Sequence, residues 1–379
     1  MNNISYTKAG VGQNVKPDVD TGRPEIRLPE APAFLIILMG SLGDVARGLC
    51  LVALLKQRFP NCVITWLVEP KCRDILAVHP LIDHVLLFDR KRWRQGLKDI
   101  VRELRGRHFD CVLDLQRHFK SGCFSRLSGA PYRLGFHPRN AKEGNWLFNN
   151  RHIPFQDEFY PKLFHYLKFT EYLGCHPEFL PAQSRAMLAS GVLDFGFSGL
   201  ATTALAGDVA AAVEKPFIAL VLGSSWVSKE WTFTGYTALI KKILAATPKK
   251  IVMLDTPAKL PMARDLAQEV DDARLINLVG RTSLPELAFV LQRADLAVGP
   301  DCGSAHVAAA VDTPYIALFG PTAPELTAPF GSEHLVVNKR LSCSPCYKRR
   351  CPEKSACLTS IQAADVFEKI EEVLAPASD

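Results

Sequence analysis

Short, uninterrupted apolar runs recur along this chain, and each is followed by a polar turn and a helical pattern. The first run, Phe34-Leu35-Ile36-Ile37-Leu38-Met39, is typical of a strand buried on both faces of a parallel sheet. Similar runs predict strands at 63–68, 85–88 and 109–115, separated by helices. This alternation predicts an open parallel sheet with helices on both faces.

A second series of the same kind begins at Phe217. It predicts strands at 217–222, 250–254, 275–278, 296–298 and 315–319, and a last helix at 361–374. The expected fold class is therefore α/β, with two Rossmann-like doubly wound domains facing across a cleft. We expect a mobile extension at 1–32, domains at 33–185 and 186–358, and a C-terminal helix within 359–379.

Composition limits the functions that such a fold can serve. The chain has 379 residues, of which 48% are hydrophobic and 22% charged, enough for two cores. No apolar run approaches the roughly 18 residues of a membrane span, and the first 32 residues lack the apolar region of a secretory signal. The net charge of +6 suits an anionic substrate or a membrane surface. No nucleic-acid motif is present, so we expect no nucleic-acid partner. The dense Lys and Arg of 93–107 are interpreted as a solvated helix face.

Polar side chains gather where the predicted strands end. Because ligands bind at the carboxyl ends of parallel strands, Asp44, Gln116, Arg117 and Lys120 are expected on one rim of the first sheet. Asp44 also starts a helix, whose dipole lowers the pKa of a carboxyl group. A purely capping role for Asp44 is the alternative.

Two turns of the second domain share one layout. Residues 299–306, GPDCGSAH, lead into an Ala-rich helix; Gly303 permits close approach to the backbone and Ser304 can cap the helix. A helix N-terminus is an anion site, and His306 can add a donor. Residues 224–231, SSWVSKEW, likewise bring hydroxyls and a cation to a strand end, so the two turns can converge on one pyrophosphate. The alternative for residues 299–306 is an ordinary strand-to-helix turn. The alternative for Lys229 is a surface lysine with its charge in water.

Three ordered segments together carry a family resemblance: 40–45 (GSLGDV), 225–231 (SWVSKEW) and 299–306 (GPDCGSAH). Asp114-Leu115-Gln116 with Lys120-Ser121, 133–136 (RLGF) and 319–322 (FGPT) are further landmarks. In this order and separation the chain resembles the ADP-heptose:lipopolysaccharide heptosyltransferases, glycosyltransferase family 9, from about residue 33 to its end.

The resemblance implies a GT-B fold with the acceptor in the first domain and the nucleotide-sugar in the second. It implies inversion at the sugar carbon, no cofactor, ADP-heptose as donor and a lipid-anchored, anionic lipopolysaccharide inner-core acceptor. The enzyme would work in the cytoplasm, attached peripherally to the inner face of the cytoplasmic membrane. Cations of the first domain suit such an acceptor.

The resemblance also assigns residues. Asp44 is the general base, and Lys229 with Ser224 and Ser225 meets the donor phosphates. Gly280 and Thr282 sit at the adenine, and Asp255 is the only acid in the loop that usually contacts the ribose, although the glycines common there are missing. The donor turn consists of Asp301, Cys302, Gly303, Ser304 and His306, and the acceptor side of Ser41, Gly43, Gln116, Arg117, Lys120 and Arg133.

Of the 11 cysteines, four are clustered near the C-terminus with the spacing C-x2-C-x4-C-x5-C: Cys343, Cys346, Cys351 and Cys357. This spacing is compatible with a structural zinc or iron site, and the alternative is free or disulfide-bonded thiols.

Three functions are compatible with the residues. The first is the heptosyltransferase; the second is a family member that uses another nucleotide-sugar or a protein acceptor. The third is a non-catalytic nucleotide-sugar-binding protein, which the presence of both Asp44 and Lys229 disfavours. A Rossmann dehydrogenase is disfavoured because the first strand is followed by Gly-Ser-Leu-Gly-Asp and not by G-x-G-x-x-G.

Overall fold

The fold comes from a computed structural model of the chain. It describes residues 26–176, 216–353 and 355–375, together with 187, 193–197, 209, 210, 213 and 214. Most of the expected N-terminal extension and the expected domain boundary at 185/186 lie outside the described residues.

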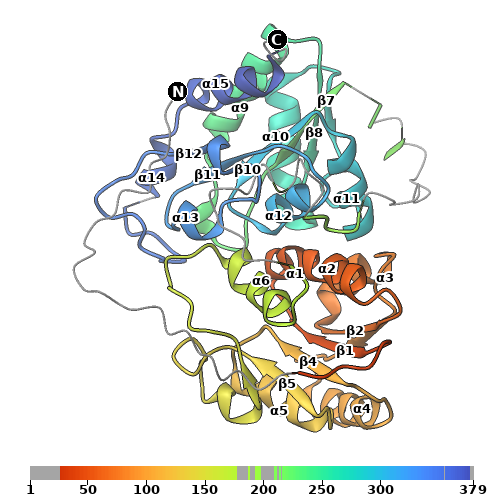
Figure 1. The fold of residues 1–379 in the computed structure, drawn as a ribbon. Helices are drawn as coiled ribbons and strands as arrows, with labels where there is room; N and C mark the ends of the chain where they lie inside the picture. The colour runs from red at the N-terminus through yellow and green to blue at the C-terminus, as the bar shows by residue number, and fades with distance from the viewer. Residues whose placement is uncertain are drawn as a thin grey trace.

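Two six-stranded, wholly parallel sheets form the framework (Figure 1). In sheet order, the first consists of β3 (His84–Leu87), β2 (Val63–Val68), β1 (Ala33–Ile37), β4 (Cys111–Asp114), β5 (Tyr132–Gly135) and β6 (Arg151–His152). The second consists of β12 (Val336–Asn338), β11 (Tyr315–Phe319), β10 (Leu296–Pro300), β7 (Phe217–Val221), β8 (Lys250–Leu254) and β9 (Leu275–Asn277). Both sheets follow the strand order 3-2-1-4-5-6 of dinucleotide-binding folds, so the predicted pair of doubly wound domains is confirmed.

Helices cover both faces of the first sheet. They are α1 (Leu42–Gly48), α2 (Cys50–Arg58), η1 (Pro70–Cys72), α3 (Arg73–Ala77), α4 (Trp93–Arg105), α5 (Phe119–Leu127), η2 (Asn145–Phe148) and α6 (Lys162–Tyr172). Figure 1 shows α1, α2, α3 and α6 between this sheet and the second domain, and α4 and α5 on its far side. The far side has its own core, in which Ile100 and Leu104 of α4 pack on Leu35 and Ile37 of β1.

The second sheet is covered in the same way. Its helices are η4 (Val227–Lys229), α9 (Phe233–Ala246), η5 (Pro257–Lys259), α10 (Leu260–Val270), α11 (Leu284–Arg293), α12 (Gly303–Ala310), α13 (Pro324–Thr327), η6 (Glu333–Leu335), α14 (Ala356–Thr359) and α15 (Ala363–Leu374). The last helix, α15, packs against α9, and its Val366, Phe367 and Ile370 join the outer core of this domain. The C-terminal helix is therefore built into the second domain.

The inner faces of the two domains meet at α1 and α12, and one apolar core continues across the junction. Two glycines make this approach possible. A Cβ on Gly43 would lie 2.7 Å from Cδ2 of His306, and a Cβ on Gly303 would lie 3.0 Å from Cβ of Leu42. The close backbone approach predicted for Gly303 is thus made toward the first domain.

Differences from the sequence prediction are confined to short or broken elements. The first helix is interrupted at Leu49, so that α1 and α2 replace one continuous helix. The segment between β5 and β6 contains the short helix η2. Strands β6 and β12, with two and three residues, were not predicted because such short segments carry no measurable alternation.

Candidate active site

Asp44 lies in the first turn of α1, at the carboxyl end of β1. Its Oδ2 accepts hydrogen bonds from the backbone N–H of Ser41 (3.1 Å) and from the Ser41 hydroxyl (3.0 Å). Its Oδ1 accepts from Nη2 of Arg47 (2.6 Å) and from the hydroxyl of Tyr166 on α6 (3.4 Å). Asp44 therefore does cap its helix, and it also forms an ion pair with Arg47.

These contacts control the charge of Asp44. Burial alone would raise the pKa of its carboxyl group, but the charges of Arg47 and Lys162 and the hydrogen bonds from Arg47 and Ser41 outweigh burial. The pKa of Asp44 is held well below its usual range, so the side chain is a carboxylate at every physiological pH. Its side chain remains 23% exposed, which leaves room for a ligand hydroxyl.

Arg47 links the two domains. Its guanidinium is buried, and Nη1 contacts Nε2 of His306 on α12. Because arginine can only donate, Nε2 of His306 must accept and the ring proton must sit on Nδ1, which has no partner among the described residues. Burial and the charge of Arg47 hold the pKa of His306 well below its ordinary value, so the ring is neutral. Sequence reasoning missed Arg47; its position one helical turn after Asp44 was the available signal.

Lys229 lies at the end of η4, and its ammonium group is largely enclosed. Nζ is 2.6 Å from Oδ2 of Asp301 and 4.5 Å from the ring centroid of Trp226, and the side chain is 14% exposed. The alternative of a surface lysine with its charge in water is therefore wrong.

Asp301 holds Lys229 in place. The same Oδ2 atom accepts a hydrogen bond from the buried hydroxyl of Thr322 (2.7 Å), and the carbonyl oxygen of Asp301 accepts from the hydroxyl of Ser224 (3.0 Å). The turns at 224–231 and 299–306 thus converge, as predicted. Within them, the carboxylate of Asp301 orients the ammonium group of Lys229. From the sequence, Thr322 was identified only as part of the 319–322 motif and was given no role in the site.

The start of α12 differs from the prediction. The helix begins at Gly303 with Cys302 as the N-cap, so Ser304 is its second residue and does not cap it. Cys302 forms no side-chain cap; its Sγ lies 3.7 Å from the hydroxyl of Tyr315. The predicted capping role of Ser304 is therefore wrong, because the helix starts two residues earlier than a cap at Ser304 requires. Ser225 in the facing turn is exposed.

The residues assigned to the nucleoside lie beyond β8 and β9. Oδ2 of Asp255 accepts from the backbone N–H of Gly223 (2.7 Å), and Oδ1 accepts from that of Thr256 (2.7 Å). Gly280 has φ +74° and donates its N–H to the carbonyl of Asp255 (2.8 Å), while Thr282 is half-buried nearby in sequence. Asp255 thus fixes the turn after β7.

One unpredicted ion pair borders this turn. Lys259 pairs with Glu230 (2.6 Å) and its side chain crosses Gly223, where a Cβ would lie 2.5 Å from Cε of Lys259.

The acceptor-side residues divide into two groups. Arg117 faces the site: its guanidinium contacts Nδ1 of His165 and lies 4.1 Å from the centroid of Phe136, and burial lowers its pKa. Lys120 lies 5.3 Å from the centroid of Phe88. Ser41 and Gly43 flank Asp44.

Gln116 and Arg133 instead hold the chain together. Oε1 of Gln116 accepts from the backbone N–H of Met39 (2.8 Å). The guanidinium of Arg133 donates to the carbonyls of Ala130 (2.7 Å) and Phe148 (3.0 Å). These bonds use Oε1 of Gln116 and Nε and Nη1 of Arg133, and contact of either side chain with an acceptor stays a prediction.

Helix α6 supplies three site residues that sequence reasoning missed. Tyr166 reaches Asp44, His165 reaches Arg117, and the charges of Asp44 and Asp301 both act on Lys162. Their spacing of three and four positions places them on one helix face, which was the available signal.

The four clustered cysteines lie at different depths in the structure. In the described part of the chain no three His, Cys, Asp or Glu side chains come together in a way that could hold a metal ion. Cys343 is exposed, whereas Cys357 is buried with its sulfur beneath Gly320, and all four are free. The structure shows the alternative of free thiols, while the charges of Cys351 and Cys343 act on Cys357, so a structural metal site stays a prediction.

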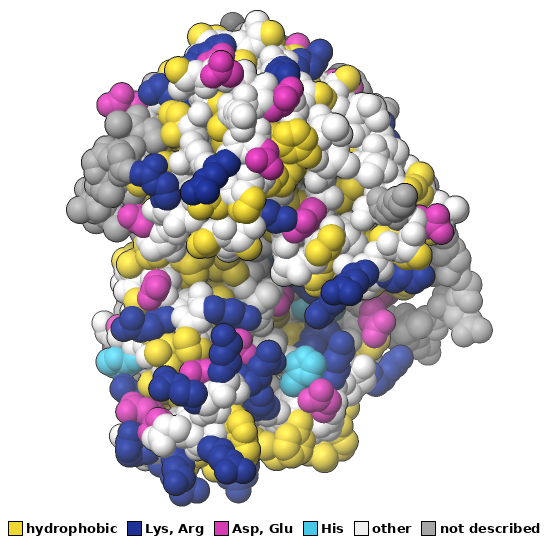
Figure 2. All heavy atoms as spheres, turned by 180° about the vertical axis from the view of Figure 1, so that it is seen from behind, with side chains coloured by type: hydrophobic (Ala, Val, Ile, Leu, Met, Phe, Trp, Pro, Cys, Tyr) yellow, Lys and Arg dark blue, Asp and Glu magenta, His cyan; other side chains and the backbone are white. Residues whose placement is uncertain are grey.

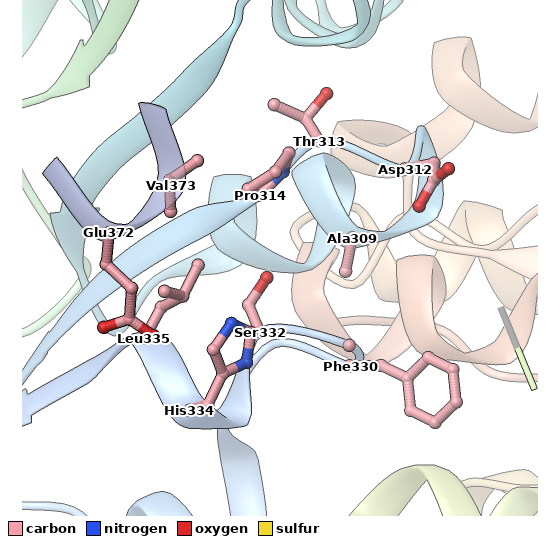
Figure 3. Close-up of a pocket in the computed structure, with 11 residues that line it drawn as sticks. Ala309, Asp312, Thr313, Pro314, Phe330, Ser332, His334, Leu335, Glu372 and Val373 are labelled. Atoms are coloured by element: carbon pink, nitrogen blue, oxygen red, sulfur yellow. The ribbon is translucent and has the colours of Figure 1, made fainter. Parts of the chain in front are cut away.

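One cavity lies away from these residues (Figure 3). It has a volume of about 560 Å³ and is lined by Asp312, Pro314, Phe330, His334 and Glu372, among others. Pro314 precedes β11 and Asp312 follows α12, so the cavity lies at the opposite edge of the second sheet from Asp301.

The fold and these residues define a GT-B glycosyltransferase, with a carboxylate on one domain and a lysine and a helix N-terminus on the other. The chain belongs to glycosyltransferase family 9 (heptosyltransferase), whose family model matches residues 97–357. The protein is accordingly an enzyme of the transferase class.

Named relatives extend along most of the chain. The lipopolysaccharide core heptosyltransferase OpsX of Haemophilus influenzae is 28% identical over 82% of this chain and 85% of its own length. Lipopolysaccharide heptosyltransferase 1 of Pseudomonas aeruginosa is 27% identical over 84% and 86%. The structure of E. coli heptosyltransferase WaaC with ADP has a TM-score of 0.68 at 24% identity, covering 90% of this chain and 97% of WaaC. Within the described residues no helix has the length and apolar character needed to cross a membrane.

Proposed function

We propose that the enzyme transfers heptose from ADP-heptose to a lipopolysaccharide inner-core acceptor, with inversion at the sugar carbon. The names of the relatives support this reaction, and E. coli WaaC has been solved with ADP and with ADP-2-deoxy-2-fluoro heptose. The enzyme would work at the inner face of the cytoplasmic membrane and attach to it peripherally.

One observation carries the proposal: a carboxylate and a cation from different domains meet where α1 packs on α12. Asp44 is linked through Arg47 to His306, and the charge of Lys229 acts on the same His306 ring. Sugar transfer requires a base beside the acceptor and positive charge beside the leaving group, so the two requirements are met on opposite sides of one junction.

Asp44 is proposed as the general base. The acceptor oxygen forms a bond to the anomeric carbon while the bond from that carbon to the ADP oxygen breaks, and the hydroxyl proton passes to Asp44. A carboxylate of low pKa is a weak base toward a free alcohol. The oxocarbenium-like character of glycosyl transfer makes the attacking hydroxyl strongly acidic only as the new bond forms, so a late proton transfer to a well-placed carboxylate suffices.

Lys229 is proposed to neutralise the departing pyrophosphate. Asp301 and Trp226 keep its ammonium group in place before the donor arrives, so little reorganisation is needed during the reaction. The N-terminus of α12 adds partial positive charge, and the protonated Nδ1 of His306 is a free donor. The same two turns also contain Ser225, Cys302 and Ser304. The nucleoside of the donor is proposed to bind at Asp255, Gly280 and Thr282.

We propose that cationic side chains of the first domain bind the acceptor. The charge of Asp44 acts on Arg117 and Lys162, and Lys120 lies in the first turn of α5. A core oligosaccharide rich in phosphate and carboxylate needs such cationic partners. The domains are proposed to divide at 185/186, between the two sheets.

The reaction can be tested with a panel of nucleotide-sugars in a thermal-shift assay, followed by calorimetry of ADP. ADP-heptose and ADP should raise the melting temperature, and Lys229→Ala should weaken ADP binding and turnover together. Lys241→Ala, which removes an exposed lysine paired with Glu269, is the matched control. Stabilisation by a different nucleotide-sugar alone would favour the second family function, and unchanged ADP affinity in Lys229→Ala would remove Lys229 from the site.

A further inference from the structure

Large apolar side chains are exposed mainly on the first domain. Of the 14 that are exposed in the described residues, 11 lie between Val63 and Tyr160, and only Val227, Phe233 and Tyr347 lie on the second domain. Five of the 11 lie in three successive helices: Trp93 and Leu97 of α4, Phe119 of α5, and Trp146 and Leu147 of η2. We call these five residues the apolar rim.

The apolar rim lies at the sheet edge that carries Asp44. Helix α4 follows β3 and α5 follows β4, so each begins near the carboxyl end of a parallel strand, and Asn145, the first residue of η2, donates to Asp114 at the end of β4 (2.6 Å). Helix α1, which bears Asp44, begins at the carboxyl end of β1 in the same sheet. The start of each element therefore faces the same side as the proposed acceptor site.

The elements that carry the rim are neighbours, because α5 packs on both α4 and η2. The ring of Phe119 meets that of Phe148, next to Leu147 in the sequence, at 5.1 Å in an edge-to-face arrangement. Nζ of Lys120 lies 5.3 Å from the centroid of Phe88, and α4 packs on Asp89 through Gly96. Exposed apolar side chains gathered on neighbouring elements mark interaction sites.

Positive charge surrounds the rim. Residues 89–120 contain ten Lys and Arg against five Asp and Glu. Arg92 pairs with Asp89 and Arg102 with Asp99, but Lys91, Arg94 and Lys98 form no ion pair with the described residues. Figure 2 shows one face of the molecule, on which Lys and Arg gather over the lower half, the first domain, with hydrophobic side chains at its foot.

We infer that the apolar rim, with Lys91, Arg94 and Lys98, docks the enzyme on an anionic lipid bilayer. Tryptophan and phenylalanine side chains prefer the headgroup level of a bilayer, and basic residues beside them attract anionic lipids. A second copy of the chain is a poorer partner, because a two-fold contact would place like charges opposite one another. The purpose of docking, presentation of a lipid-anchored acceptor to Asp44, rests on the proposed function.

The test is flotation of the full-length protein with vesicles of phosphatidylethanolamine and phosphatidylglycerol, compared with pure phosphatidylcholine. The wild type should bind the anionic vesicles and release them at high salt. Lys91→Gln, Arg94→Gln and Lys98→Gln should each weaken partitioning about fivefold. The combined variant Trp93→Ser, Phe119→Ser, Leu147→Ser should lose binding, whereas Phe233→Ser, an exposed aromatic of the second domain, should keep it.

Transfer to acceptors of two kinds separates this inference from the reaction itself. With a soluble, lipid-free acceptor the rim variants should turn over like the wild type, and with acceptor embedded in vesicles they should be slower. The inference is overturned if the wild type does not bind anionic vesicles, if the rim and control variants bind equally, or if the rim substitutions dissociate a dimer without affecting vesicle binding. Absence of transfer by the wild type with both acceptors would overturn the proposed function and leave the vesicle result standing.

Discussion

The contact of Arg47 with Asp44 should stabilise the protein measurably. The Nη2–Oδ1 distance is 2.6 Å, and the side chains of Arg47 and Asp44 are 9% and 23% exposed. An aspartate beside an arginine loses about 1–3 units of pKa, and each unit corresponds to about 1.4 kcal/mol. Because Lys162 and Ser41 also support the Asp44 carboxylate, the lower part of this range applies. We expect a coupling energy of about 1.4–3 kcal/mol at pH 7.

A double-mutant cycle measures this quantity. Arg47→Gln, Asp44→Asn and the combined variant would be unfolded with urea at pH 7, and the coupling compared with that of Arg102 and Asp99. The control pair has the same spacing, but Arg102 is 77% exposed and the atoms are 3.3 Å apart, so its coupling should stay below about 0.5 kcal/mol.

The sign of the pH dependence follows from the lowered pKa of Asp44. The stabilisation is complete above the unfolded-state pKa of aspartate, about 3.9, and is lost as the pH falls below it. Equal coupling in the two pairs would refute the reasoning that Arg47 and Asp44 form a buried, mutually supporting unit.

Three further outcomes follow from the same contacts. Gly43→Ala should destabilise the protein by about 1–3 kcal/mol in urea unfolding, because the new Cβ would meet His306; a variant of wild-type stability would show that α1 and α12 separate freely. Buried, neutral His306 should reduce stability by about 1.4 kcal/mol per pH unit below 6.5, because only the unfolded state takes up the proton; His306→Gln should lose this slope, and an unchanged slope would contradict the assignment. Among the clustered cysteines, exposed Cys343 should react with a thiol reagent before Cys357, whose pKa is raised by burial; the reverse order would argue against the described packing.

The sequence predicted the framework of the site because local patterns determine it. Continuous apolar runs identified the strands, and a parallel sheet places the turns after those strands at one edge. Asp44, Lys229 and the 299–306 turn were found in this way, since each directly follows a strand end.

What the sequence did not predict depends on contacts between distant positions. Arg47 acquires its role from His306, 259 positions away, and Tyr166 reaches Asp44 across 122 positions. Asp301 was expected to meet the donor, but its partner is Lys229, 72 positions away. No local pattern reports such pairings.

Side-chain direction is a second property that local patterns do not predict. The spacing of the four clustered cysteines does not indicate that Cys357 is buried while Cys343 is exposed. The charge of Arg133 does not indicate that its guanidinium donates to two backbone carbonyls. Sequence spacing and charge show which contacts a side chain is able to make. The packing of the fold determines which of these contacts are formed.

The turnover of Asp44→Asn tests the central claim most directly. Asparagine keeps the shape of the side chain and still caps helices well, but it cannot take up the acceptor proton. We expect turnover with ADP-heptose and acceptor to fall by about 10²–10⁴, while ADP affinity stays at the wild-type value. Wild-type turnover in Asp44→Asn would contradict the account and leave Asp44 with only its capping and ion-pair roles.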